Sequence, residues 1–192
     1  MPQATKWFKG LFQAQIAGDV PLTIKQAASQ TAKALQVLDS ADAEIFSILA
    51  NGIGTVRYAE VSIAAAAIAA LRATPATLVA APGAGKSLEF IAAAFYLDYT
   101  APGFTESADN LAVKYVDGSG VAVSQTIECT GFIDQTADTV TNALAKIDAI
   151  ATKAQSENVA LVLHNTGDGE FGGSGGSTLR VKVAYRVHTT GF

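Results

Sequence analysis

Alternation of apolar and polar residues over most of the chain predicts a series of short β-strands. The clearest case is 179–188, where every second residue is apolar and most of the residues between are charged. Strands are also expected at 56–63, 77–81, 88–99, 111–116, 121–129 and 158–164. The sequence DGSG at 117–120 is typical of a tight hairpin turn. Short strands at close intervals indicate an all-β sandwich.

The first fifty residues follow a different pattern. Apolar residues recur three to four positions apart in 22–38, which predicts a helix. A second short helix is expected at 41–50, preceded by an aspartate–serine pair that can cap it and ended by Asn51-Gly52. The composition changes at this point. We therefore expect a helical N-terminal extension, residues 1–52, and a β-sandwich domain, residues 53–192.

Two stretches inside the sandwich domain also have helical spacing. Residues 64–73 are rich in alanine and predict one or two helical turns. Residues 134–150 predict a longer helix, because one helical face collects Val140, Leu144, Ile147 and Ile150.

The first twelve residues carry an aromatic cluster beside two lysines. It consists of Trp7, Phe8, Leu11 and Phe12. Such a cluster is typical either of an amphipathic membrane anchor or of an arm that packs on its own domain or a neighbouring subunit. A membrane anchor needs a longer apolar face and a more basic polar face, so we favour the arm. These four residues are our hypothesis for subunit or partner contacts.

The sequence PGAGKS at 82–87 resembles the end of a nucleotide-binding P-loop. Ala80 stands where that pattern requires glycine, and a P-loop must continue into a helix whose amino terminus faces the phosphates. The aromatic and apolar residues of 88–99 predict a strand instead. We therefore expect a hairpin turn with a solvated Lys86, and a nucleotide-binding enzyme remains the alternative.

The composition favours an assembly. Only 16% of the 192 residues are charged while 49% are apolar, whereas soluble domains average about 25% charged residues. So few charges cover a monomer poorly, which indicates that partners bury part of its surface.

The net charge of −4, with scattered basic residues, gives no sign of a nucleic-acid surface. We expect neither a membrane span nor a secretory signal, because the longest apolar run is nine residues.

Few residues are candidates for chemistry. Cys129 is the single cysteine, which excludes an internal disulfide and fits a reducing cytoplasm; as a nucleophile it has no histidine near it in sequence. His164 and His188 could join Asp168 or Glu170 at a metal, but their spacing matches no metal-binding motif. The GDGE sequence around Asp168 resembles a fragment of a calcium loop without its terminal glutamate.

Acidic and hydroxyl side chains give no stronger signal. The loop acids are Asp98, Glu106, Asp109 and Asp117, and we expect them to be solvated or bonded to their own turns. The serines considered as nucleophiles are Ser87, Ser119 and Ser124. They lack the G-x-S-x-G sequence that surrounds the nucleophile of a hydrolase. The glycine-rich sequence at 167–177 predicts a flexible, exposed loop. We expect no enzyme, no cofactor and no metal.

Several longer phrases of the sequence are similar to those of a known group of proteins. They are AALRATPATLVAAPGAGK at 69–86, TESADNLAVKYVDGSG at 105–120, IECTGFIDQTADTV at 127–140, LVLHNTGDGEFGGS at 161–174 and LRVKVAYRVH at 179–188. Together they resemble the decoration, or cement, proteins of tailed-bacteriophage heads. The resemblance spans roughly residues 56–190 and leaves the N-terminal fifty residues uncovered.

The resemblance implies a jelly-roll β-sandwich on the head exterior that bridges neighbouring major capsid protein subunits, commonly as a homotrimer. It implies a structural virion protein, made in the host cytoplasm, that binds neither nucleic acid nor membrane. The alternative is a tail-fibre or tail-associated structural protein. Such a protein would bind host glycans through loop residues, which we identify as Phe104, Glu106, Asp109 and Phe171.

Overall fold

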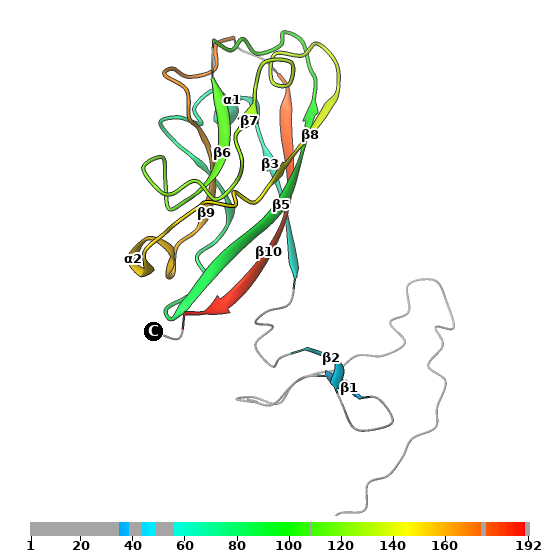
Figure 1. Cartoon of the computed structure of the whole chain (residues 1–192). Helices are drawn as coiled ribbons and strands as arrows, with labels where there is room; N and C mark the ends of the chain where they lie inside the picture. Colours follow the sequence, from blue (N-terminus) through cyan, green and yellow to red (C-terminus); the bar gives the residue numbers. More distant parts are fainter. Residues whose placement is uncertain (1–34, 39–43, 49–55, 108, 174–175, 191–192) are drawn as a thin grey trace, which may run out of the picture. The chain divides into compact units, whose positions relative to one another are not determined.

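The computed structural model describes residues 35–38, 44–48, 56–107, 109–173 and 176–190. It divides into two units, Met1–Asn51 and Gly52–Phe192. Among the described residues no helix has the length and apolar character needed to cross a membrane. The described residues of the second unit form a mainly β structure (Figure 1).

In the first unit the structure describes a pair of strands. β1 (Leu35–Leu38) pairs antiparallel with β2 (Glu44–Ile48), and Leu35 lies opposite Ile48. The helices expected at 22–38 and 41–50 are therefore wrong over these residues; the rest of both predictions lies outside the described residues. The β-branched and aromatic residues of LQVL and EIFSI favour strands. The aspartate–serine pair taken as a helix cap is equally typical of a turn.

The described residues of the second unit form eight strands in two four-stranded antiparallel sheets. They are β3 (Arg57–Ile63), β4 (Ala76–Val79), β5 (Lys86–Asp98), β6 (Asn110–Tyr115), β7 (Ile127–Glu128), β8 (Thr139–Leu144), β9 (Leu161–Asn165) and β10 (Thr178–Thr189). One sheet, here the β5 sheet, has the order β3-β10-β5-β8; the other, the β6 sheet, has the order β4-β9-β6-β7. This interleaved order is that of an eight-stranded jelly roll, as the resemblance to head decoration proteins implies.

The core lies between the two sheets. β5 and β10 alternate between buried and more exposed residues, and their buried side meets the largely buried strands β6 and β9. Phe95 and Val181 of the β5 sheet are fully buried, as are Val113 and Leu163 of the β6 sheet. The chain crosses between the sheets after nearly every strand. Strands that are consecutive in sequence therefore mostly pack on opposite sides of one core.

Two short helices lie in the connections. α1 (Ala65–Ile68) follows β3 and buries Ile68, which confirms the helical turns expected at 64–73. α2 (Lys153–Ser156) precedes β9, and Thr152 and Gln155 form a capping box at its start.

The glycine-rich turn at 82–87 is not a hairpin. β4 pairs with β9 and β5 pairs with β10 and β8, so this turn carries the chain from one sheet to the other. The strand expected after it is confirmed, because β5 begins at Lys86. The Gly83 amide donates to Asn158 Oδ1 at 2.9 Å. The turn therefore lacks the helix amino terminus that a phosphate-binding loop requires.

The helix expected at 134–150 is wrong. Residues Thr139–Leu144 form strand β8, which pairs with Ala92–Leu97 of β5. Thr139, Val140 and Thr141 are β-branched and favour the strand. The strand expected at 121–129 shrinks to Ile127–Glu128, with isolated bridges at Ala122 and Ser124. The turn expected at 117–120 is confirmed by a bond from the Gly120 amide to Asp117 O.

The glycine-rich loop at 167–177 is partly anchored, where a freely exposed loop was expected. Phe171 and Ser177 are buried. The Gly172 amide donates to Thr105 O at 2.8 Å, and the Thr105 amide returns a bond to Gly172 O. The buried Phe171 ring and the two bonds with Thr105 together anchor this part of the loop.

Candidate interaction surface

Large apolar side chains remain exposed along β8 and the loop that follows it. Val140 is 55% exposed and Leu144 60%, while Ile147 and Ile150 in the loop are 98% and 87% exposed. Tyr96 of β5 is 40% exposed beside them. We call these five residues the β8 surface. Single exposed apolar residues are ordinary on soluble proteins, but a contiguous group marks an interaction site.

Strand pairing places the β5 and β8 members of the β8 surface on one face of the β5 sheet. Tyr96 lies directly opposite Val140, and Ala92 lies directly opposite Leu144, in the register of β5 with β8. These residues point away from the core, because Phe95 and Ala143 occupy the inward positions of the same strands. Cross-strand neighbours on one face lie about 4.5–5.5 Å apart at Cβ. Because Ala92 has a small side chain, the side chains of Leu144 and Tyr96 project beyond it on this face.

The loop after β8 projects two isoleucines into solvent. The Ala149 amide donates to Lys146 O at 3.4 Å, which closes a turn. Lys146 Nζ lies 3.8 Å from Asp148 Oδ1 on the same turn. The turn thus places a charged pair beside Ile147 and Ile150. No described core contact buries these two side chains, so their burial requires a partner.

A hollow opens at the other end of β8. Its volume is about 440 Å³, and it is lined by Tyr96, Leu97, Asp98, Asp138, Thr139, Val140 and Arg180. Asp138 Oδ1 accepts a bond from the Tyr99 amide at 2.9 Å, which fixes one side of the rim. The hollow therefore combines apolar walls with two acidic groups and one guanidinium group.

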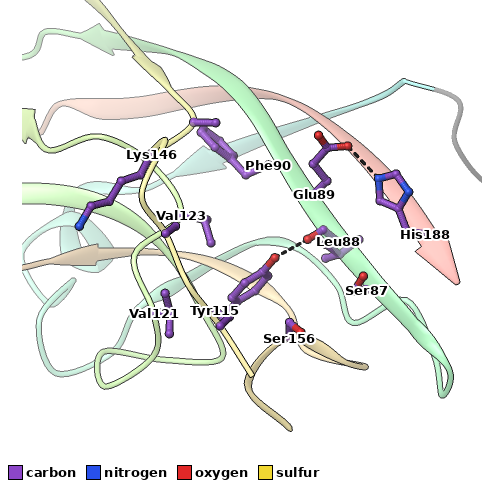
Figure 2. Close-up of a pocket in the computed structure, with 13 residues that line it drawn as sticks. Ser87, Leu88, Glu89, Phe90, Tyr115, Val121, Val123, Lys146, Ser156 and His188 are labelled. Atoms are coloured by element: carbon purple, nitrogen blue, oxygen red, sulfur yellow. Dashed lines mark hydrogen bonds and ion pairs between the residues drawn. The ribbon is translucent and has the colours of Figure 1, made fainter. Parts of the chain in front are cut away.

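A second cavity, of about 470 Å³, lies where β8 leaves β5 (Figure 2). Tyr115 donates its hydroxyl to Leu88 O at 2.5 Å and so joins the two sheets. Glu89 Oε2 lies 2.8 Å from His188 Nε2 and 3.3 Å from Arg186 Nη1. The His188 hydrogen bond is the main cause that holds the pKa of Glu89 below its usual value.

The polar groups around this second cavity do not converge. In Figure 2 Lys146 directs its ammonium group away from Glu89 and His188. His188 is bonded to Glu89 rather than to the Ser87 hydroxyl, so the described residues give no activated nucleophile there. Small-molecule sites combine an apolar lining with a few polar groups aimed at one point. The β8 surface is therefore the stronger candidate for function.

The structure separates the two histidines considered as metal ligands. His164 lies in β9 of the β6 sheet and His188 in β10 of the β5 sheet. Glu170 accepts bonds from the Arg72 and Ala73 amides at 3.0 and 2.7 Å and so caps a turn. The part of the chain that the structure describes holds no group of three or more acidic, histidine or cysteine side chains placed for a metal.

Cys129 is buried, and burial is the main cause that raises its pKa well above the ordinary value for a thiol. A neutral buried thiol is a poor nucleophile. Two of the loop acids, Asp117 and Glu106, bond to their own turns, as the sequence predicts. Asp117 Oδ1 accepts from the Ser119 amide at 2.8 Å, and Glu106 Oε2 accepts from the Asp109 amide at 3.2 Å.

The residues expected to bind glycans are mostly inaccessible. Phe104 and Phe171 are each 3% exposed and Asp109 is 2% exposed, so the aromatic rings are core residues. Only Glu106 of that set is partly exposed. The expected contact residues Trp7, Phe8, Leu11 and Phe12 lie outside the described residues.

Sequence reasoning missed the β8 surface because it assigned Val140 and Leu144 to a helix. The signal that could have indicated a strand is the β-branched run Thr139, Val140 and Thr141.

Comparison with known proteins gives a distant structural likeness. No family model and no curated protein matches the chain. A chain of the cyanophage Pam1 capsid asymmetric unit matches with 15% identity and a TM-score of 0.38, over 79% of this chain and 99% of that one. A chain of the Ralstonia phage GP4 capsid matches with 16% identity and a TM-score of 0.36, over 70% and 85% respectively. Likeness at these TM-scores carries no conclusion about function.

Proposed function

We propose that this protein is a structural, non-enzymatic component of a tailed-phage head, which binds the shell exterior and bridges major capsid protein subunits. The observation that carries the proposal is the β8 surface, a group of exposed apolar residues on a chain with few charges, which an assembly would cover. The resemblance of residues 56–190 to head decoration proteins supplies the kind of partner. The jelly-roll fold agrees with what that resemblance implies.

A bridging protein stabilises a shell by adding contacts that must break before the subunits separate. We propose that three copies act together as a homotrimer. Once one copy is bound, the other two meet their sites at high effective concentration. Weak single contacts then give firm attachment overall, which suits a protein that joins a shell after the shell has formed.

The N-terminal arm is proposed as a further contact with the shell or a neighbouring copy. Trp7 would supply an aromatic anchor of the type enriched among residues that dominate binding energy, and the further apolar area would come from Phe8, Leu11 and Phe12. Removing residues 1–20 is expected to leave the jelly roll folded and to reduce binding to shells. Unchanged occupancy of the truncated protein would exclude the arm as an anchor.

The proposal is tested by adding the purified protein to phage heads that lack it. We expect the protein to sediment with the heads at a fixed ratio and to raise the temperature at which they rupture. Leu144→Asp should reduce binding, because it places a charge in the β8 surface. Val116→Asp is the matched control, since Val116 is 49% exposed outside that surface.

Two outcomes would contradict the proposal. Absence of binding to heads by the wild-type protein would refute a decorating role. Labelled antibody that finds the protein on tails rather than heads would favour the tail-associated alternative.

A further inference from the structure

We infer that one copy of this chain docks its loop 146–150 into the Tyr96–Val140 hollow of a second copy. This inference rests on the proposed function, since it names the contact that would hold the proposed trimer together. The occupant is a second copy rather than the shell, because the loop and the hollow of this one chain match in both apolar character and charge.

The loop has the properties of an anchor. Ile147 and Ile150 are almost fully exposed, and together they present two β-branched side chains from one turn. The turn is already closed by the bond from the Ala149 amide to Lys146 O. A preformed anchor loses less conformational entropy on binding than a free loop does.

The hollow has the properties of a receptor for that anchor. Its volume of about 440 Å³ exceeds that of two isoleucine side chains, and Val140, Tyr96 and Leu97 supply apolar walls. Val140 and Tyr96 are held in place by the pairing of β8 with β5. An aliphatic side chain entering the hollow would thus meet fixed apolar atoms and displace water from them.

Charges beside the loop match charges at the rim of the hollow. Lys146 and Asp148 flank the isoleucines, with 45% and 82% of their side chains exposed. The rim carries two acids, Asp98 and Asp138, and one base, Arg180. Docking brings the loop lysine toward the acids and the loop aspartate toward the guanidinium group. Such matching selects the partner and its orientation more than it adds affinity.

The two ends of β8 define the geometry of the assembly. The hollow lies at the Thr139 end and the loop follows the Leu144 end, so each copy offers both halves of the contact at different places. A contact between different surfaces is heterologous, and repetition of it closes a ring when the rotation permits. The strand between them, TVTNAL, forms a sheet edge without any charge, whereas edge strand β3 carries Arg57 and Glu60. An uncharged edge is protected best when an assembly covers it.

Sedimentation velocity of the full-length protein at micromolar concentration tests the inference. We expect the wild-type chain to be a closed oligomer and Ile147→Asp/Ile150→Asp to be a monomer, with association weakened at least about a hundredfold. Val140→Asp should have the same effect from the hollow side. Val116→Asp should remain oligomeric. Circular dichroism checks that each variant is folded, as expected for changes at exposed positions.

Mixing the two defective variants gives a sharper test. A loop-defective copy keeps its hollow and a hollow-defective copy keeps its loop, so an equimolar mixture should form dimers through one intact contact. Each variant alone should remain monomeric. Lys146→Glu should also weaken association, and Asp98→Lys in the same chain should restore it in part.

The outcomes separate this inference from the proposed function. Oligomers that persist in the loop and hollow variants would overturn the inference, as would a wild-type monomer. Loop variants that lose head binding while the wild-type protein is monomeric would show that the shell occupies the loop, which also overturns it. Oligomerisation as described, in a protein that binds no head, would refute the decorating role and leave this contact standing.

Discussion

Phe95 and Tyr96 are consecutive residues of β5 and face opposite sides of its sheet. Phe95 has no exposed surface and lies in the core, whereas Tyr96 is 40% exposed and lies opposite Val140. One step along the strand therefore separates a residue that stabilises the fold from one that belongs to the β8 surface. Substitutions at these two positions should have different consequences.

Phe95→Ala should destabilise the protein by about 3–5 kcal/mol, because it removes a buried ring and leaves a cavity. Tyr96→Ala should cost less than about 1 kcal/mol in the isolated chain, since half-exposed outer positions contribute little to the core. Urea denaturation followed by circular dichroism measures both values. Equal losses of stability at the two positions would contradict this prediction. They would mean that another part of the same chain packs against the outer face of the β5 sheet.

Tyr115→Phe should reduce the free energy of unfolding by about 1–2 kcal/mol. The phenol hydroxyl donates to Leu88 O, and it comes from β6 whereas its acceptor belongs to β5, so this bond joins the two sheets. Tyr115 is buried, and removal of its hydroxyl leaves the carbonyl without this donor. Tyr58→Phe is the matched control, because Tyr58 is 80% exposed and should tolerate the change without measurable loss. Identical unfolding midpoints for the two variants would show that the inter-sheet bond contributes nothing.

Much of the jelly roll could be predicted from the sequence, because its strands bury one face each. In β10 the alternation of residues 179–188 matches the alternation of buried and more exposed positions. The pattern at β4 and β9 is less distinct, since these strands lie in the buried part of the structure, but their short apolar runs still indicated strands.

β8 shows why the rest could not be predicted. Val140 and Leu144 are four positions apart, and residues so spaced share a face in a helix and in a strand alike. Only the pairing with β5 decides between the two, and that pairing joins segments about fifty residues apart in the chain. The β-branched run at 139–141 could have indicated the strand, but not that this strand forms the sheet edge, and the β8 surface depends on that. The prediction of a hairpin at 82–87 was wrong for a related reason. A turn sequence shows that the chain reverses, but it does not show which sheet the next strand joins.

Cys129 should react very slowly with thiol reagents in the folded protein. Its side chain is buried, and burial together with nearby carboxylates, Glu106 foremost, raises the pKa of the thiol. Reagents attack the thiolate, so labelling at pH 8 should be at least about a hundredfold slower than in urea-unfolded chain. The protein has one cysteine, so mass spectrometry of the labelled chain reports on this site alone. Rapid labelling without denaturant would mean that the segment around β7 opens readily.

Stability should fall as the pH decreases from 7.5 to 5.5, and His164 should cause part of that fall. Burial is the main cause that lowers the pKa of His164 below its ordinary value of 6.5, and the nearby Lys114 adds to it. The unfolded chain then binds a proton more readily than the folded one. The contribution of this group is therefore complete above about pH 6.5 and is lost progressively as the pH falls below it.

Urea midpoints at the two pH values measure this effect. His164→Gln should narrow the difference between them, whereas His188→Gln, the matched change on the other sheet, should leave the His164 contribution in place. Titration of Glu89 does not contribute to the difference between the two midpoints. The pKa of this carboxyl is lowered from 4.5, so its stabilising contribution is lost only at more acid pH. A pH dependence that is identical in wild-type protein and His164→Gln would exclude His164 as its source and would place the titrating group elsewhere in the chain.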